Sequence, residues 1–361
     1  MNPIRAVVVE DSLTVRQHIV DALGADPEIA VIGEAADGKT AIELIQRLRP
    51  DVVTLDMMLP VMTGLAVAEY VMAFCPTPIL IVSASTNRGE VFKTYDALAA
   101  GAVDVLEKAN GGEPEGVWEA ELRRRVKLVA RIKVITHLQG RLARSAAGPP
   151  ASAACLPPRR AEGASGPCRA VGIGTSTGGP GACVEILRRL PADFPLPILL
   201  VIHIGPAFGV LLAEWLDSQS ALRVACARDH EPLPPRGQGR VLLAPPERHL
   251  VVRQGRIRLT DEPERFSCRP SVDCLLESLA RELGPAGVGC VLTGMGRDGA
   301  AGLLAMRQAG ARTFAQDEAT SVVFGMPQEA ARLGGAERVL PLGEFAPALA
   351  ALAGGAAGGG E

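Results

Sequence analysis

Short, largely apolar runs that each stop at a polar residue recur through the first third of the chain and constrain its fold more than any other feature. The runs and their polar endings are residues 4–9 with Glu10 and Asp11, 51–55 with Asp56, 79–82 with Ser83, and 102–106 with Glu107 and Lys108. Helical patterns separate these runs. Strands that alternate with helices predict a parallel sheet covered by helices on both faces. The sequence therefore predicts a doubly wound α/β domain.

The polar strand endings predict a site for a phosphoryl group and a hard cation. In open parallel sheets, ligands bind outside the carboxyl ends of the strands, where these side chains converge. Glu10, Asp11 and Asp56 offer oxygen ligands that suit Mg²⁺. A carboxylate can accept a phosphoryl group, Lys108 can offset its charge, and the Ser83 hydroxyl can bond one of its oxygens. Each residue alone is more often a strand-end or cap residue, so the inference rests on the ordered set.

With this set of residues, positions 1–122 resemble a response-regulator receiver domain, which has a flavodoxin-like fold. The resemblance implies that Asp56 is the phosphoacceptor and that Glu10, Asp11 and Asp56 hold Mg²⁺ during phosphorylation. It also implies that Ser83 is the switch hydroxyl and that Lys108 is the lysine of the family pocket.

Two positions depart from the receiver pattern. Ala109 follows Lys108 where the family has Pro, and Thr63 precedes Gly64 where Asp is common. The Lys-Pro bond of the family is usually cis, and a non-proline residue makes that isomer much less favourable. The loop after Lys108 is therefore where this chain is expected to differ from the family.

In the second half of the chain, the turn after residues 170–173 carries the pattern G-x-S-x-G, with Gly174 and Gly178 on either side of Ser176. This spacing suits a nucleophile on a tight strand-to-helix turn, where the helix N-terminus favours developing negative charge. Gly172 and Gly174 also begin a dinucleotide fingerprint, although Gly178 falls one position late. From the motif alone, a nucleophile, a nucleotide site and a plain turn remain equal alternatives.

Two later strand endings favour the nucleophile. Residues 197–202 end at His203, and residues 288–292 run into a glycine-flanked loop that contains Asp298. Ser176, His203 and Asp298 thus follow three strands of one sheet, where a Ser-His-Asp constellation can assemble. Their order in the chain disfavours the α/β-hydrolase fold, in which the acid precedes the histidine. Position alone does not exclude the rival residues His230, His249, Asp273 and Asp317.

Six segments of this half resemble the chemotaxis-type protein-glutamate methylesterase domain of the CheB family. They are GTSTGG (174–179), IHIGPAFG (202–209), LAPPERHL (243–250), CRPSVD (268–273), LTGMGRDG (292–299) and AQDEATSVVFGMPQEA (315–330). The resemblance implies a Rossmann-like three-layer domain with Ser176, His203 and Asp298 as its triad. It also implies that the backbone at Met295 helps to stabilise the oxyanion.

The same resemblance implies an activity and its partners. The expected reaction is hydrolysis of glutamate γ-methyl esters, with deamidation of glutamine, on the cytoplasmic domains of methyl-accepting chemoreceptors. The expected phosphodonor is the sensor histidine kinase of a chemosensory two-component pathway. Mg²⁺ is expected for receiver phosphorylation, and no cofactor is expected for the esterase reaction.

The two resemblances set the expected domain order. It consists of a receiver domain at 1–122, a connector helix with a Pro/Ala/Gly-rich linker at 123–167, a methylesterase domain at 168–348 and a flexible tail at 349–361. We interpret the basic amphipathic stretch 121–142 as a solvated connector. The unphosphorylated receiver is expected to block the active-site edge, and a phosphate on Asp56 is expected to shift the population to an open arrangement.

Composition excludes several classes of function. The 361 residues include 37 Lys+Arg and 40 Asp+Glu, and the net charge of -3 offers no attraction to nucleic acid. The apolar stretches are too short for a membrane helix and no signal peptide pattern is present, so we expect a cytoplasmic protein without membrane insertion. The 8 cysteines lack metal-ligand spacing and are interpreted as reduced thiols. A receiver-controlled binding module without esterase activity remains the alternative, and a nucleotide-dependent oxidoreductase is a weaker one.

Overall fold

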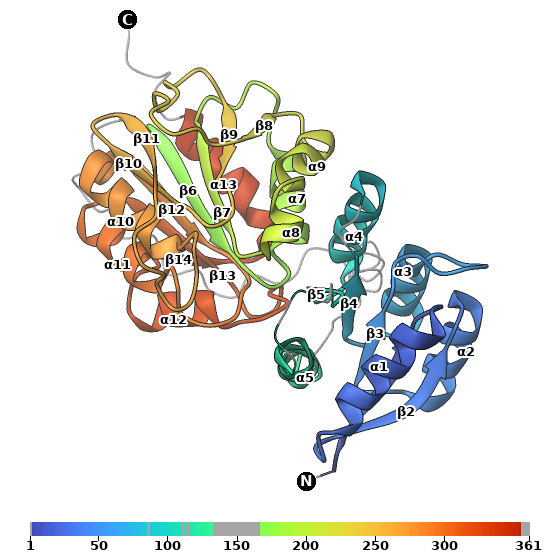
Figure 1. The fold of residues 1–361 in the computed structure, drawn as a ribbon. Helices are drawn as coiled ribbons and strands as arrows, with labels where there is room; N and C mark the ends of the chain where they lie inside the picture. Colours follow the sequence, from blue (N-terminus) through green and yellow to red (C-terminus); the bar gives the residue numbers. More distant parts are fainter. Residues whose placement is uncertain are drawn as a thin grey trace, which may run out of the picture. The chain divides into compact units, whose positions relative to one another are not determined.

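The computed structural model describes residues 2–84, 87–109, 112, 114, 116–132 and 167–354. The chain divides into two compact units, Met1–Gly163 and Ala164–Glu361. Each unit is built on a parallel sheet with helices on both faces (Figure 1), so the predicted fold class is confirmed. In the described part of the chain, no helix is both long and apolar enough to cross a membrane.

The first unit contains a five-stranded sheet in the order β2-β1-β3-β4-β5, and all its strand pairs are parallel. Its strands are β1 (Ile4–Val9), β2 (Ile29–Ala35), β3 (Val52–Leu55), β4 (Ile79–Ser83) and β5 (Asp104–Glu107). Its helices are α1 (Leu13–Gly24), α2 (Gly38–Leu48), α3 (Gly64–Phe74), α4 (Arg88–Ala100) and α5 (Val117–Val129). Helices α1 and α5 pack against each other, as do α2, α3 and α4. This strand order is the flavodoxin-like one.

Side-chain caps explain where four of these helices begin. Ser12, Asp37, Thr63 and Asn87 each precede a helix, and each side chain accepts a backbone N–H of the first turn. Such a cap typically contributes about 1 kcal/mol. Thr63 accepts the Ala66 N–H at 3.4 Å. The departure from the receiver pattern at Thr63 therefore preserves a capped start for α3.

Helix α5 is part of the first unit and changes the expected domain boundary. Trp118, Leu122, Val126 and Val129 are buried, and the helix packs on α1, β3 and β4. The boundary expected after residue 122 therefore falls inside a packed helix, and the described part of the expected connector is not solvated on this face. The apolar positions recur every three to four residues and face the sheet, which is the pattern of a core helix. Positions 133–166, with the rest of the connector and most of the linker, lie outside the described residues.

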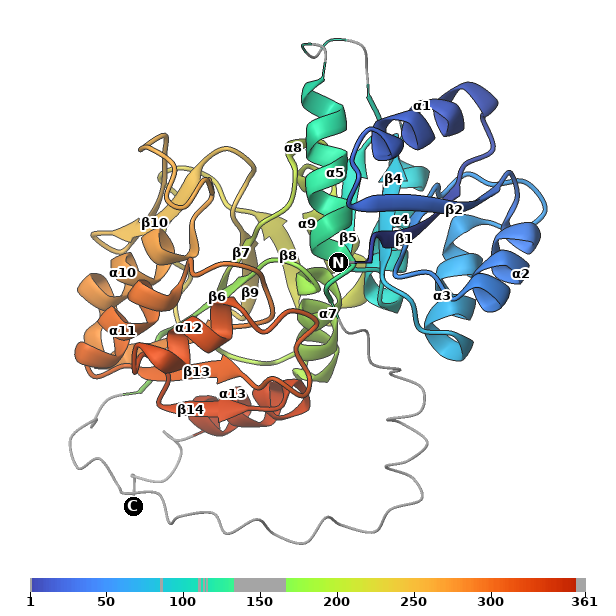
Figure 2. The ribbon, with the colours of Figure 1, turned by 90° about the horizontal axis from the view of Figure 1, so that it is seen from below.

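The second unit contains a seven-stranded parallel sheet in the order β14-β13-β12-β6-β7-β9-β8. Its strands are β6 (Ala170–Thr175), β7 (Ile198–Ile202), β8 (Arg223–Cys226), β9 (Arg240–Leu243), β12 (Gly287–Val291), β13 (Arg312–Gln316) and β14 (Arg338–Leu340). Its helices are α7 (Gly179–Arg189), α8 (Pro206–Gly209), α9 (Leu212–Gln219), α10 (Val272–Leu283), α11 (Ala300–Gln308), α12 (Met326–Arg332) and α13 (Phe345–Gly354). Helices α7, α9 and α13 form one layer, and α10, α11 and α12 form the other (Figure 2).

Two features of the second unit differ from the expected layout. Strands β10 (His249–Arg253) and β11 (Arg256–Thr260) form an antiparallel hairpin outside the main sheet. Helix α13 buries Leu349 and Ala353, so the folded unit continues past residue 348, where the flexible tail was expected to begin. Positions 355–361 lie outside the described residues.

Two glycines of the G-x-S-x-G region lie inside β6, where α10 packs closely on the strand. A Cβ at Gly174 would lie 2.0 Å from Val272 Cγ1, and a Cβ at Gly172 would lie 2.5 Å from Leu279 Cδ1. A dinucleotide fingerprint needs its glycines in the turn that approaches the phosphates. Gly172 and Gly174 instead allow α10 to pack closely against β6. This removes the basis of the nucleotide-binding alternative.

Each main sheet reverses its strand order at one point. The reversal lies between β1 and β3 in the first unit and between β6 and β12 in the second. At such a point the crossovers leave on opposite faces and open a crevice at the carboxyl edge. Asp11 and Asp56 follow the two strands in the first unit, and Ser176 and Asp298 follow the two strands in the second.

Candidate active site

Ser176 stands at the turn between β6 and α7. Its N–H donates to Thr293 O at 3.0 Å, and its carbonyl oxygen accepts the Gly179 N–H at 2.7 Å. Gly178 precedes α7 with a φ of 78°, in the left-handed region that favours glycine. The Ser176 residue is half-buried. Backbone hydrogen bonds on both sides therefore hold it at the carboxyl edge of the sheet.

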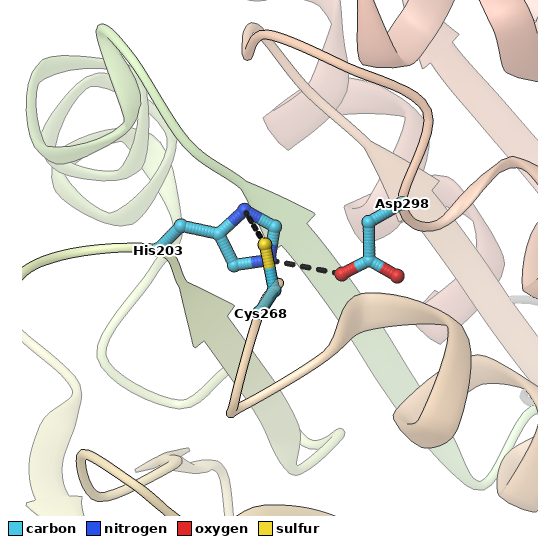
Figure 3. A group of neighbouring side chains, drawn as sticks. All are labelled: His203, Cys268 and Asp298. Carbon is cyan, nitrogen blue, oxygen red and sulfur yellow. Dashed lines mark hydrogen bonds and ion pairs between the residues drawn. The ribbon is translucent and has the colours of Figure 1, made fainter. Parts of the chain in front are cut away.

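His203 follows β7, the strand next to β6. Its N–H donates to Thr175 O at 3.0 Å, so this strand ending is joined to the residue before Ser176. The imidazole has two distinct neighbours (Figure 3): Nε2 lies 2.9 Å from Asp298 Oδ2, and Nδ1 lies 3.7 Å from Cys268 Sγ. The structure thus brings the predicted histidine and aspartate into direct contact.

Asp298 is buried, and the N-terminus of α10 supplies most of its hydrogen bonds. Oδ1 accepts the Ser271 hydroxyl at 2.7 Å and the Asp273 N–H at 3.0 Å, while Oδ2 accepts the Val272 N–H at 2.7 Å. Burial opposes the charged form. The bonds to His203, Ser271 and Asp273 outweigh burial, so the pKa of Asp298 lies below its usual value.

The pairing with Asp298 shifts the pKa of His203. Burial lowers the pKa of His203, but the hydrogen bonds to Asp298 and Cys268 outweigh burial and raise that pKa to about 9. Because Nε2 faces the carboxylate, Nδ1 is the nitrogen that can exchange a proton with a reacting group. Sequence reasoning did not single out Cys268 or Ser271, although both lie in the quoted segment CRPSVD.

The loop after β12 is fixed against the Ser176 turn. Thr293 O accepts the Ser176 N–H, and Thr293 Oγ1 donates to Thr177 O at 2.9 Å. A Cβ at Gly294 would lie 2.8 Å from Ser176 Cβ, so this approach requires glycine. Met295 comes next and is 40% exposed. The residue expected to help stabilise the oxyanion therefore belongs to a loop that contacts Ser176 directly.

The two rival histidines have different surroundings. His249 is buried, its Nδ1 accepts the Ser271 N–H at 3.1 Å, and its Nε2 lies 3.2 Å from Pro263 O. Both ring nitrogens therefore hold the segment that leads to Ser271. His230 is exposed, and its Nε2 lies 3.5 Å from Asp229 Oδ2. Neither arrangement resembles a catalytic base beside a nucleophile.

The two rival carboxylates hold backbone elements. Asp273 Oδ1 accepts the Gly302 N–H at 2.7 Å and so joins α10 to α11. Burial raises the pKa of Asp273 to about 6. Asp317 Oδ1 accepts the Thr320 N–H at 3.0 Å and shapes a turn. Among the described interactions, Asp298 is the carboxylate bonded to His203.

His203, Cys268 and Asp298 also offer donor atoms within 4.8 Å of one another, a spacing that a metal ion could span. Both oxygens of Asp298 already accept N–H or O–H donors at the start of α10. His203 presents a different nitrogen to each of its neighbours. A cation beside Asp298 would meet the positive end of that helix. We therefore interpret this group as a catalytic pair with an adjacent thiol.

In the first unit, Lys108 joins the two acids of the predicted receiver pocket. Its Nζ lies 2.8 Å from Glu10 Oε2 and 3.1 Å from Asp56 Oδ1, and both acids are buried. The peptide bond between Lys108 and Ala109 is trans. Lys108 therefore reaches the pocket without the proline that the family places after it.

Burial and the neighbouring charges shift the pKa values of three ionisable residues in this pocket, Glu10, Asp56 and Lys108. Burial raises the pKa of Asp56 and of Glu10 above their usual values, although Lys108 pulls both downward. Burial lowers the pKa of Lys108, but its bonds and charges with Glu10 and Asp56 outweigh burial and raise it. Donor atoms of Glu10, Asp11 and Asp56 lie within 4.8 Å of one another. An all-carboxylate donor set of this kind suits Mg²⁺.

Ser83 lies at the same edge of the sheet, but its hydroxyl forms a hydrogen bond with a residue other than Asp56. It ends β4 and is buried, and its Oγ donates to Glu90 Oε1 on α4 at 3.0 Å. The structure therefore brings four of the five predicted pocket residues together and places the Ser83 hydroxyl against a neighbouring helix.

A carboxylate pocket in one unit, and a serine turn beside a His-Asp pair in the other, define a response regulator whose output domain is an ester hydrolase. The sequence pattern of the response regulator receiver domain matches residues 6–114, and that of the CheB methylesterase matches residues 171–349. The chain belongs to the CheB methylesterase family, because relatives with 44% identity cover 96% of it.

Two relatives cover nearly the whole chain. A protein-glutamate methylesterase/protein-glutamine glutaminase 2 of Anaeromyxobacter dehalogenans is 44% identical over 96% of this chain and 96% of its own length. A protein-glutamate methylesterase/protein-glutamine glutaminase of Nitrosospira multiformis is 44% identical over the same shares, 96% and 96%. Among solved structures, the catalytic domain of the Thermotoga maritima CheB methylesterase is 36% identical with a TM-score of 0.49, covering 51% of this chain and 98% of that one.

Proposed function

We propose that this protein hydrolyses glutamate γ-methyl esters on the cytoplasmic domains of methyl-accepting chemoreceptors. The observation that carries the proposal is the 2.9 Å contact between His203 Nε2 and Asp298 Oδ2, at the carboxyl edge of the sheet that also carries the Ser176 turn. The substrate class follows the names of the relatives. Glutamine side chains would be deamidated by the same route, because a nucleophile attacks ester and amide carbonyls in the same way.

In the proposed reaction, Ser176 Oγ attacks the ester carbonyl carbon while His203 Nδ1 takes the hydroxyl proton. Asp298 holds the imidazolium that forms. Backbone N–H groups near Met295 stabilise the oxyanion, a contribution typically worth ~3 kcal/mol per donor. The carbonyl then re-forms as the bond to the methoxy oxygen breaks, and methanol leaves with the proton from His203.

Water completes the cycle. It attacks the acyl-enzyme carbonyl while His203 takes a proton, and the proton returns to Ser176 Oγ as the serine leaves. The products are a glutamate side chain and the free enzyme. Every proton in both half-reactions passes through His203 Nδ1, because Nε2 stays on Asp298.

Replacing the nucleophile tests this proposal. Ser176→Ala should abolish methanol release from a methylated receptor fragment. Ser218→Ala, on α9, is the matched control, because its hydroxyl donates to Trp215 O and takes no part in the site. Thermal melting curves of both variants show whether the fold is kept. Methanol release near the wild-type rate from Ser176→Ala would contradict the proposal.

We further propose that phosphorylation of Asp56 by a sensor histidine kinase raises this activity. Glu10, Asp11 and Asp56 would hold Mg²⁺, which supplies charge neutralisation for the incoming phosphoryl group. Lys108 would move from the Asp56 carboxylate to a phosphoryl oxygen. Ser83 would exchange its bond to Glu90 for another phosphoryl oxygen, which couples the pocket to α4.

We place this reaction in the cytoplasm. The receptor domains that carry the substrate side chains are cytoplasmic in the proposal, and the phosphodonor kinase acts in the same compartment. The described cysteines are free thiols, which suits a reducing environment.

A further inference from the structure

A strained turn lies beside the His203–Asp298 pair. Phe266 and Ser267 have φ values of 52° and 59°, and neither is glycine. The flanking residues close the turn, because the Arg265 N–H donates to Cys268 O at 3.2 Å and the Cys268 N–H donates to Arg265 O at 2.9 Å. Backbone strain that the surroundings enforce is concentrated at functional sites.

Neighbouring side chains hold this turn firmly. Arg265 Nη1 lies 2.8 Å from Glu277 Oε1 on α10. At the other end, Cys268 Sγ lies 3.7 Å from His203 Nδ1. Both flanking residues are thus tied inward, toward α10 and the active site. Phe266, at the tip, remains 47% exposed despite its apolar ring.

Arg297 covers the ring of Phe266. Its Cζ lies 4.5 Å from the ring centroid, a cation–π geometry that restrains the guanidinium. Arg297 is exposed and directly precedes Asp298. In the described part of the chain, no carboxylate forms an ion pair with Arg297. The pKa of Glu329 is lowered mainly by its hydrogen bond to Arg332 and to a smaller extent by the charge of Arg297. Among the described residues, Arg297 is therefore a restrained cation without an ion-pair partner, two residues from the 40% exposed Met295.

The cation is not needed for the reacting group itself. A glutamate methyl ester and a glutamine amide are both neutral, so an arginine gains little from either. A partner with a carboxylate beside the reacting side chain would gain a charge-assisted hydrogen bond from the guanidinium and an apolar contact from Phe266. Charge complementarity of this kind mainly sets specificity and association rate.

We propose that Phe266 and Arg297 form a docking surface for an acidic segment of the substrate protein, placed next to the side chain that is hydrolysed. The inference rests on the proposed esterase function and adds to it a residue pair that selects the substrate. It makes Arg297 a specificity residue that takes no part in proton transfer.

The test compares Arg297→Glu with Arg223→Glu on a methylated receptor fragment and on p-nitrophenyl acetate. Arg223 is exposed at the start of β8 and therefore lies at the amino edge of the sheet, away from the carboxyl edge that carries Arg297. Arg223→Glu is thus the matched control for the change of charge. Arg297→Glu should lower kcat/KM on the receptor fragment about tenfold more than on the small ester, mainly through KM, while Arg223→Glu lowers neither. Raising the salt concentration should shrink the difference.

A binding measurement separates this inference from the esterase proposal. In the Ser176→Ala background, fluorescence anisotropy should show that Arg297→Glu weakens binding of the same fragment. Replacing the fragment's acidic residues by their amides should remove that difference, as a double-mutant cycle requires. Equal losses on both substrates, or an unchanged anisotropy titration, would overturn the docking surface. If Ser176 is not the nucleophile, the anisotropy comparison still tests the docking surface, because it measures binding and not hydrolysis.

Discussion

The two units place a buried aspartate beside a cation at the same point of the same kind of sheet, yet the two aspartates have opposite properties. Asp56 pairs with Lys108 at 3.1 Å, and burial raises its pKa. Asp298 pairs with His203 at 2.9 Å, and its pKa is lowered. The architecture determines where the carboxylates lie. Their other hydrogen bonds determine what each can do.

The difference lies in the number of donors that each carboxylate meets. Asp298 accepts the Ser271 hydroxyl and two N–H groups from the first turn of α10. This carboxylate is saturated, and it serves as a fixed negative charge. Asp56 accepts the Met57 N–H at 2.7 Å and a backbone N–H of Met58, in addition to its contact with Lys108. It retains oxygen lone pairs for a metal ion and a phosphoryl group.

The largest expected effect comes from removing the fixed charge. Asp298→Asn should lower the rate of methanol release by about 10³–10⁴-fold, because a neutral amide neither orients His203 correctly nor steadies the imidazolium. The measurement is kcat on a methylated receptor fragment. Asp317→Asn is the control, since that carboxylate shapes a turn and is not bonded to His203. An Asp298→Asn rate within tenfold of wild type would show that the pair is not catalytic.

The second prediction concerns Asp56, the carboxylate that retains oxygen lone pairs for a metal ion and a phosphoryl group. Asp56→Asn should abolish incorporation of phosphate from a small phosphodonor, and EDTA should do the same to the wild-type protein by removing Mg²⁺. Neither treatment should remove basal methanol release, because the proposed esterase reaction uses no metal. Loss of basal release on adding EDTA would contradict the assignment of metal chemistry to the receiver pocket alone.

The third prediction is a pH dependence that belongs only to the His203–Asp298 pair. The pKa of His203 is raised to about 9. Since the neutral imidazole is the proposed base, kcat/KM should rise with pH from neutrality to about 9. The raised pKa also stabilises the fold fully below the unfolded value of about 6.5, and this stability should be lost as the pH rises toward 9. With rising pH, an increase in activity together with a decrease in the free energy of unfolding would confirm that the pKa of His203 is raised in the folded protein.

In the Asp298→Asn variant the rise in kcat/KM should move to lower pH, because the carboxylate that raises the pKa of His203 is gone. An unchanged profile would mean that another group titrates. Kinetic measurements between pH 6 and 9.5 on wild type and variant, a range set by the values of about 6.5 and 9, decide the point.

The smallest expected effect concerns the support of Asp298. Ser271→Ala removes a hydroxyl that both caps α10 and donates to Asp298 Oδ1. The free energy of unfolding should fall by about 1–2 kcal/mol, as for other N-cap losses. Ser12→Ala, which removes the cap of α1, should cost a similar amount without changing the pH profile of esterase activity. Equal effects of both variants on that profile would argue against a separate role for Ser271.

Much of this comparison could be predicted from the sequence, because it depends on strand order and strand endings. Runs such as residues 4–9 and 170–173 are apolar and short, and the residues after parallel strands necessarily share one edge. For that reason Glu10, Asp56, His203 and Asp298 were found. Helix periodicity likewise predicted α/β layers in both units.

The rest depends on tertiary contacts that leave little local pattern. Gly172 and Gly174 were ambiguous because close packing of a helix and close approach of a phosphate both require glycine. Ser271 and Cys268 reach the site from a segment that lies 65 to 68 residues beyond His203. The end of the receiver was misplaced because basic residues on the outer face of α5 masked its buried face, which includes Leu122 and Val126.

The most direct test of the central claim is the site at which a serine-reactive fluorophosphonate attaches. Mass spectrometry of the labelled, digested protein should place the adduct on Ser176, and His203→Gln should slow the labelling, because His203 is the proposed base that activates this hydroxyl. This result would also exclude a binding module without esterase activity. An adduct on another residue, or no adduct on Ser176 in a preparation that releases methanol, would contradict the account.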